Sequence, residues 1–161
     1  MAAASRSTGP VLLAACLAAG GASAQIPRDG PIDWSLCFGG PTHVVSPTPQ
    51  DRFGTYAVTG ATRGAAGLAE SLSVECVGTF EVLGSASKSQ GYCLYQDRAG
   101  DRIYGTDNRT PAGYTWELLG GTGKYAGITG RGTTEILGIV TPVRPGTLQG
   151  CRRLVGSYKL P

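Results

Sequence analysis

Hydrophobic and polar residues alternate along much of the chain with a period of two. The clearest run lies between Leu68 and Val82. Its apolar positions, all of one parity, are Leu72, Val74, Cys76, Phe80 and Val82. Because successive side chains of a strand point to opposite faces, this pattern predicts a half-buried strand of an antiparallel sheet.

Shorter segments of the same kind follow one another at even spacing, separated by turns rich in Gly, Pro and Asp. We expect strands over 34–38, 53–60, 92–96, 103–106, 114–119, 133–140 and 148–160. We expect loops or turns at 39–51, 63–67, 84–91, 97–102, 111–113 and 142–146. Outside the N-terminus no segment shows a helical period. The pattern predicts an all-β domain, either a sandwich or a barrel.

The N-terminal segment has the pattern of an export signal. Arg6 precedes an apolar run over Val11–Ala19, and Ala22-Ser23-Ala24 forms an Ala-x-Ala cleavage site. We expect residues 1–24 to be a signal peptide, 25–33 a flexible leader and 34–161 the folded domain, exported to the periplasm or beyond the cell. No later apolar run is long enough for a membrane span.

An alternative interpretation concerns Cys16. Leu13-Ala14-Ala15-Cys16 is similar to a bacterial lipobox, in which this cysteine would become a lipidated N-terminus anchored to a membrane. The apolar run continues through Ala19 and the Ala-x-Ala site follows it, so we favour signal cleavage.

Charge is nearly balanced, with 14 Lys and Arg against 11 Asp and Glu. The only basic doublet, Arg152-Arg153, is interpreted as a solvated strand end. No basic stripe interleaved with aromatic residues is present, which argues against a nucleic-acid partner.

Residues 120–132 hold six glycines in thirteen positions. A phosphate-binding Walker loop requires Ser or Thr after its Lys, but Lys124 is followed by Tyr125, and the segment after the glycines is β-rich rather than helical. The stretch therefore predicts a glycine corner between two strands, and no cofactor.

The same stretch carries a resemblance. Gly-Gly-Thr-Gly-Lys-Tyr-Ala-Gly-Ile-Thr-Gly over 120–130, with Trp116 upstream, resembles the motif of the allene oxide cyclase and dirigent superfamily, including small secreted bacterial members of uncharacterised function. The resemblance covers the chain from about Trp34 to its end. It implies a calycin-like, eight-stranded antiparallel β-barrel, often with an apolar cavity. The plant members form oligomers, and nothing in this sequence supports transferring that property.

Four cysteines remain after the signal segment, and an even number in an exported chain predicts two disulfides. Three connectivities are possible. We favour Cys76–Cys93 because their segments can be antiparallel neighbours; Cys37–Cys151 would then tie the two ends of a closed barrel. No Cys-x-x-Cys pair exists and His43 is the only histidine, so no metal site is expected.

Three functional hypotheses follow. In the first, the barrel binds a small apolar molecule, because an eight-stranded barrel can hold one small ligand. The candidate lining residues, which combine an aromatic face with a polar tip, are Tyr56, Tyr92, Tyr104, Tyr114 and Trp116.

The second hypothesis is a cyclase or isomerase, as the resemblance implies, although no catalytic residue of that superfamily can be matched here. Glu135 shares strand parity with Leu137 and Ile139, so we expect it to point inward and to be a candidate acid or base. Asp107, at a strand end, is a second candidate. The third hypothesis is a secreted interaction or inhibitor module, which an exposed apolar patch on the barrel exterior would favour.

Overall fold

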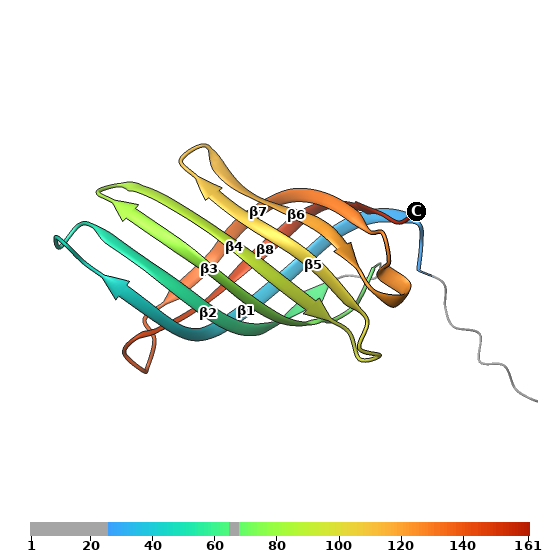
Figure 1. Ribbon diagram of the computed structural model, residues 1–161, viewed down its shortest axis with the longest axis horizontal. Helices are drawn as coiled ribbons and strands as arrows, with labels where there is room; N and C mark the ends of the chain where they lie inside the picture. Colours follow the sequence, from blue (N-terminus) through green and yellow to red (C-terminus); the bar gives the residue numbers. More distant parts are fainter. Residues whose placement is uncertain (1–25, 65–67) are drawn as a thin grey trace, which may run out of the picture.

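A computed structural model describes residues 26–64 and 68–161 and shows eight antiparallel strands closed into one barrel (Figure 1). Each strand pairs with the next, and β8 returns to pair with β1. The expected all-β fold with a single eight-stranded antiparallel barrel is confirmed. The expected signal peptide and Cys16 lie outside the described residues. The elements are β1 (Asp29–Val45), β2 (Arg52–Gly64), β3 (Ser73–Leu83), β4 (Ala86–Gln96), β5 (Arg102–Thr110), β6 (Gly113–Gly121), η1 (Gly123–Tyr125), β7 (Thr129–Val140) and β8 (Thr147–Lys159).

The first strand is longer at both ends than the sequence predicts. Residues 29–33, expected in the leader, pair with residues 155–159 of β8, so the leader expectation is wrong from Asp29 onward. The strand also continues through Gly39-Gly40-Pro41 to Val45, where a loop was expected. The reason is the β8 ladder, which extends through Pro41 and so supports the glycine and proline positions from one side.

Residues 84–91 form a strand rather than the expected polar loop. Only residues 84 and 85 turn the chain, and β4 then pairs with β3 from Ala86 onward. Ser87, Ser89 and Gly91 point inward, at half-buried or buried positions, while Lys88 and Gln90 are exposed. The alternation is therefore present, but small polar residues stand where the sequence analysis looked for apolar ones.

One end of the barrel is filled by large apolar side chains. Trp34 and Tyr95 lie with ring centroids 5.8 Å apart, and Trp116 packs over Gly132 and Gly156. A Cβ on Gly132 would lie 2.5 Å from the Trp116 ring, so this close packing requires glycine. The buried residues that complete the closed end include Ile32, Leu36, Leu68, Leu72, Ile103, Leu118, Ile128, Leu154 and Tyr158.

The glycine corner seals the same end. Gly123 and Gly127 have φ of 53° and 72°, values that favour glycine, and they flank the short helix η1. The turn places Tyr125 inside, where it is 1% exposed and donates a hydrogen bond to Asp97 at 3.2 Å. Lys124 forms an ion pair with the same carboxylate. The motif therefore acts as a plug, as a strand–corner–strand element would allow.

Both expected disulfides are present, and they lie on opposite faces of the barrel wall. Cys37–Cys151 joins β1 to β8, with Cys37 exposed on the outer face. Cys76–Cys93 joins β3 to β4, and both of its cysteines are buried. The preferred connectivity is confirmed. Within the described residues, no helix has the length and apolar character needed to cross a membrane.

Candidate functional site

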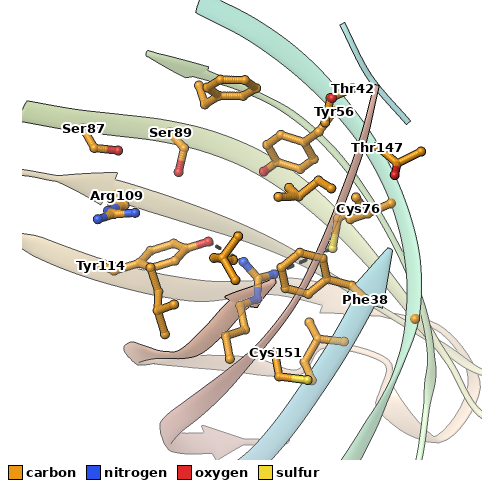
Figure 2. A pocket seen from close by; sticks show the side chains of 18 of the residues that line it. Phe38, Thr42, Tyr56, Cys76, Ser87, Ser89, Arg109, Tyr114, Thr147 and Cys151 are labelled. Atoms are coloured by element: carbon orange, nitrogen blue, oxygen red, sulfur yellow. Dashed lines mark hydrogen bonds between the residues drawn. The ribbon is translucent and has the colours of Figure 1, made fainter. Parts of the chain in front are cut away.

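The other half of the barrel encloses a cavity of about 410 Å³ (Figure 2). Its lining comes from strand segments near the hairpins that join β1 to β2, β3 to β4, β5 to β6 and β7 to β8, opposite the plugged end. Most of the wall is apolar; the side chains that make this surface include Phe38, Val44, Val58, Val74, Phe80, Val82, Ile136, Ile139 and Leu148. The barrel is therefore a cup with one filled and one hollow half.

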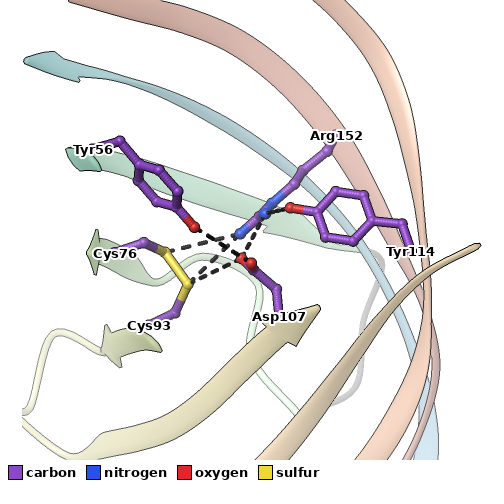
Figure 3. Close-up of a disulfide and its surroundings, with 6 residues drawn as sticks. All are labelled: Tyr56, Cys76, Cys93, Asp107, Tyr114 and Arg152. Carbon is purple, nitrogen blue, oxygen red and sulfur yellow. Dashed lines mark hydrogen bonds and ion pairs between the residues drawn. A yellow bond between two sulfur atoms is a disulfide. The ribbon is translucent and has the colours of Figure 1, made fainter. Parts of the chain in front are cut away.

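A polar cluster forms the floor of the cup (Figure 3). Arg152 of β8 and Asp107 of β5 form an ion pair at 2.7 Å, and their side chains are only 8% and 3% exposed. The same Arg152 nitrogen, Nη1, donates to the Tyr114 hydroxyl, while Nη2 lies 3.6 Å from Cys93 Sγ and 3.9 Å from Cys76 Sγ. Its Nε has no hydrogen-bond partner. One buried guanidinium thus gathers groups from four strands.

Two glycines make room for Tyr56 beside this cluster. Gly78 and Gly91 pair with each other, and a Cβ on either would overlap the Tyr56 hydroxyl end. The ring lies over this gap, and its hydroxyl approaches Asp107 Oδ1 at 3.4 Å. Asp107 does not line the cavity, because Arg152 and Tyr56 lie between it and the hollow space.

The protonation states of the floor follow from burial and the ion pair. Burial, with Asp107 nearby, raises the pKa of Tyr56, and burial also raises the pKa of Tyr114 although Arg152 opposes this shift. Burial acts to lower the pKa of Arg152, but the Asp107 carboxylate outweighs it and raises the pKa. Both phenols therefore stay neutral hydrogen-bond donors, and the guanidinium stays charged.

One side of the cavity wall differs from the rest in polarity. Ser89 of β4 lies opposite Arg109 of β5, which in turn lies opposite Tyr114 of β6. Ser87 lies beside them on β4, and all four line the cavity (Figure 2). Arg109 forms no hydrogen bond or ion pair with any residue that the structure describes. A second, shallower hollow of about 600 Å³ borders the same arginine and includes both Glu81 and Lys88.

Three of the five candidate aromatic residues are inside the barrel. Tyr56 and Tyr114 line the cavity, whereas Trp116 is 4% exposed in the filled half and donates from Nε1 to the Thr133 carbonyl oxygen at 3.0 Å. Tyr92 and Tyr104 are 58% and 41% exposed on the outer face, so neither can line the cavity. They alternate with the buried Cys93 and Ile103, and this parity was readable from the sequence.

Glu135 faces outward, contrary to expectation. It is exposed and pairs with Arg153, whose side chain is on the outer face with Asp33. The expectation assumed that Glu135, Leu137 and Ile139 share a face. A β-bulge between Ile136 and Gly138 inserts one extra residue, so that Ile139 lines the cavity although Glu135 does not. The weaker candidate, Asp107, is the buried carboxylate.

The doublet Arg152-Arg153 was only half understood from the sequence. Arg153 is a solvated residue bound bidentately to Asp33, at 2.7 and 2.6 Å, as a strand-end interpretation implies. Arg152 points the other way, into the barrel. The alternation of Leu154, Gly156 and Tyr158 along β8 carried this signal, because Arg152 has the same parity as these residues.

The floor also brings Cys76, Cys93 and Asp107 together within metal-ligand distances. The two sulfurs are joined in a disulfide and so provide no thiolate, and the carboxylate is paired with Arg152. This cluster does not fit a metal ion.

Comparison with known proteins adds no assignment. No family model, no curated protein and no solved structure matches this chain.

Proposed function

We propose that this protein binds a small, largely apolar molecule inside the hollow half of the barrel. The observation that carries the proposal is the cavity itself: about 410 Å³ lies within the range of small-molecule sites, and its wall is mostly aliphatic and aromatic. Tyr56, Tyr114 and Arg152 at the floor supply a small number of donors that would orient a bound molecule.

Export of the protein is part of the proposal. Two intramolecular disulfides are typical of oxidising compartments, and the signal-like N-terminus supports export to the periplasm or the exterior. We also propose distant membership of the allene oxide cyclase and dirigent superfamily. The glycine motif, the strand number and an apolar cavity support this membership.

Titration with a neutral fluorescent probe, N-phenylnaphthylamine, tests the binding proposal. Ile136 lines the cavity, so Ile136→Trp should fill space and abolish the fluorescence increase. The neighbouring Leu137 is exposed and does not line the cavity, so Leu137→Trp is the matched control and should bind normally. Equal binding by both variants, or no binding by the unaltered protein, would contradict the proposal.

An isomerase or cyclase activity is the second candidate. The observation that favours it is the buried floor cluster, where two neutral phenols and a charged guanidinium could donate to a developing oxyanion. In that case Tyr114→Phe should lower turnover of a bound substrate while leaving its Kd nearly unchanged. If binding and turnover fell in parallel, the phenol would only hold the ligand.

A further inference from the structure

The cavity contains an arginine whose charge no described residue neutralises. Arg109 is half-buried, lines the cavity, and has no hydrogen bond or ion pair with residues 26–64 or 68–161. The three ion pairs of this part of the chain are Lys124–Asp97, Arg152–Asp107 and Arg153–Asp33. Arg109 therefore differs from Arg152, whose Asp107 partner is close and buried.

The groups around Arg109 are hydrogen-bond donors rather than anions. Ser89 and Tyr114 are its cross-strand neighbours on the inward face, and Ser87 follows on the same wall. Among the residues that line the cavity there are three arginines, Arg52, Arg109 and Arg152, and no Asp or Glu. Since Asp107 offsets one of these charges, the hollow half of the barrel carries a net positive charge.

A half-buried cation beside hydroxyl donors is an arrangement that attracts an anion. A guanidinium presents several N–H groups in a planar fork that matches the oxygens of a carboxylate or sulfonate, and hydroxyl groups can complete the shell. The wall that faces this polar strip across the cavity is apolar, with Phe38, Ile136 and Ile139 among its residues. The two walls together fit a molecule with one acidic end.

We propose that the natural ligand of this cavity is an apolar organic anion, whose acidic group is bound by Arg109 with Ser87 and Ser89. This inference rests on the proposed binding function and adds the ligand's charge and its orientation. The apolar body would lie along the aliphatic wall, and the acidic group would face β4 and β5 rather than the floor, where Asp107 would repel it.

A pair of probes that differ by one anionic group separates the two proposals. Anilinonaphthalene sulfonate is N-phenylnaphthylamine with a sulfonate added, so the shared body reports the cavity and the difference reports the anion site. We expect the unaltered protein to bind the sulfonate more tightly. Arg109→Gln should weaken sulfonate binding about ten-fold, the effect of losing one charged hydrogen bond. It should change binding of the neutral probe less than about two-fold, since that probe carries no charge for Arg109 to pair with.

Two further variants control for charge and folding. Arg109→Lys keeps the cation and should recover most of the sulfonate affinity. Arg131→Gln removes a cation from the exposed outer face of β7 and should leave both probes unaffected. The thermal transition of each variant, measured first, distinguishes an unfolded protein from an altered site.

The outcomes are distinguishable. If neither probe binds, the binding function fails. If the neutral probe binds but Arg109→Gln leaves the sulfonate affinity unchanged, or weakens both probes equally, the anion site is refuted and the apolar cavity stands. Loss of sulfonate binding on Arg52→Gln but not on Arg109→Gln would place the anion at the mouth and would also overturn this assignment.

Discussion

Replacing Asp107 by Asn tests the energetic role of the buried cluster most directly. The change keeps the size of the side chain and removes its charge. Arg152 would then remain 8% exposed, with a neutral amide in place of its carboxylate and an Nε that already has no partner. Because the guanidinium cannot lose its proton in this environment, the positive charge stays buried without compensation.

The size of the effect follows from the burial of the pair. Breaking a buried ion pair by removing one partner costs about 3–5 kcal/mol of unfolding free energy. We expect about 3 kcal/mol, at the lower end, because an Asn oxygen can still accept one hydrogen bond from Arg152. For a domain whose total stability is typically about 5–15 kcal/mol, this is a large fraction.

The chain contains its own control. Arg153 and Asp33 form an equally short pair, but their side chains are 45% and 46% exposed, so water replaces the lost interaction in Asp33→Asn. Urea unfolding of oxidised protein, followed by tryptophan fluorescence and circular dichroism, gives both free energies if the two probes coincide. A double variant, Asp107→Asn with Arg152→Met, should recover part of the loss because no buried charge remains. Equal losses for Asp107→Asn and Asp33→Asn would refute the reasoning.

Two other predictions concern alkaline pH and close packing. Burial raises the pKa of Tyr95 from 10.0 to about 12, so its contribution to stability is present below pH 10 and is lost as the pH rises through about 12; Tyr95→Phe should flatten the pH dependence of urea stability over this interval, and an unchanged slope would contradict the prediction. On β7, Gly132→Ala would overlap Trp116 and the Val155 carbonyl and should cost about 3 kcal/mol, whereas Gly138→Ala meets nothing within 4 Å and should leave the thermal transition nearly unchanged. Similar losses at both positions would show that packing is not the cause.

The strands with apolar inward positions were predictable from the sequence, and the reason is their burial. Leu72, Val74 and Cys76 alternate with polar residues because their side chains enter a solvent-free core. The same alternation correctly placed Cys76 and Cys93 on adjacent strands. A period of two thus identifies each strand and its buried face wherever the barrel is filled.

The site was harder to predict because its residues break that pattern. Ser87 and Ser89 point inward yet are polar, so β4 was interpreted as a loop. Arg152 occupies an inward position as a cation, and no local signal identifies the carboxylate that neutralises it, since Asp107 is 45 residues away. Glu135 failed for a different reason, because a single inserted residue in a bulge reverses every later side chain. Long-range pairing and bulges are properties of the sheet and are not carried by either strand alone.

Side-chain size along the inward face explains why a cavity exists in one half of this barrel. An eight-stranded barrel is just wide enough to be filled by side chains, so it is hollow only where the inward residues are small. The plugged half has Trp34, Tyr95, Trp116 and Tyr125 in these positions. The hollow half has many small inward residues instead, among them Thr42, Gly54, Gly60, Gly78, Ser87, Ser89, Gly91 and Thr147. Two of these glycines are partly occupied by Tyr56, which narrows the cavity at its floor.

The ion pair then determines how deep the cavity can be. At the boundary between the halves, Arg152 crosses the barrel to Asp107 and is flanked by Phe38 and Tyr114, with their ring centroids 5.5 and 5.7 Å from the guanidinium carbon. A ligand that entered further would have to separate this pair, at the cost of several kcal/mol estimated above for Asp107→Asn. An apolar ligand therefore stops at Arg152, and any acidic group that it carries meets its unpaired cation at Arg109, on the β4–β5 wall. The buried pair and the free arginine together restrict the cavity to a short molecule bound in one orientation.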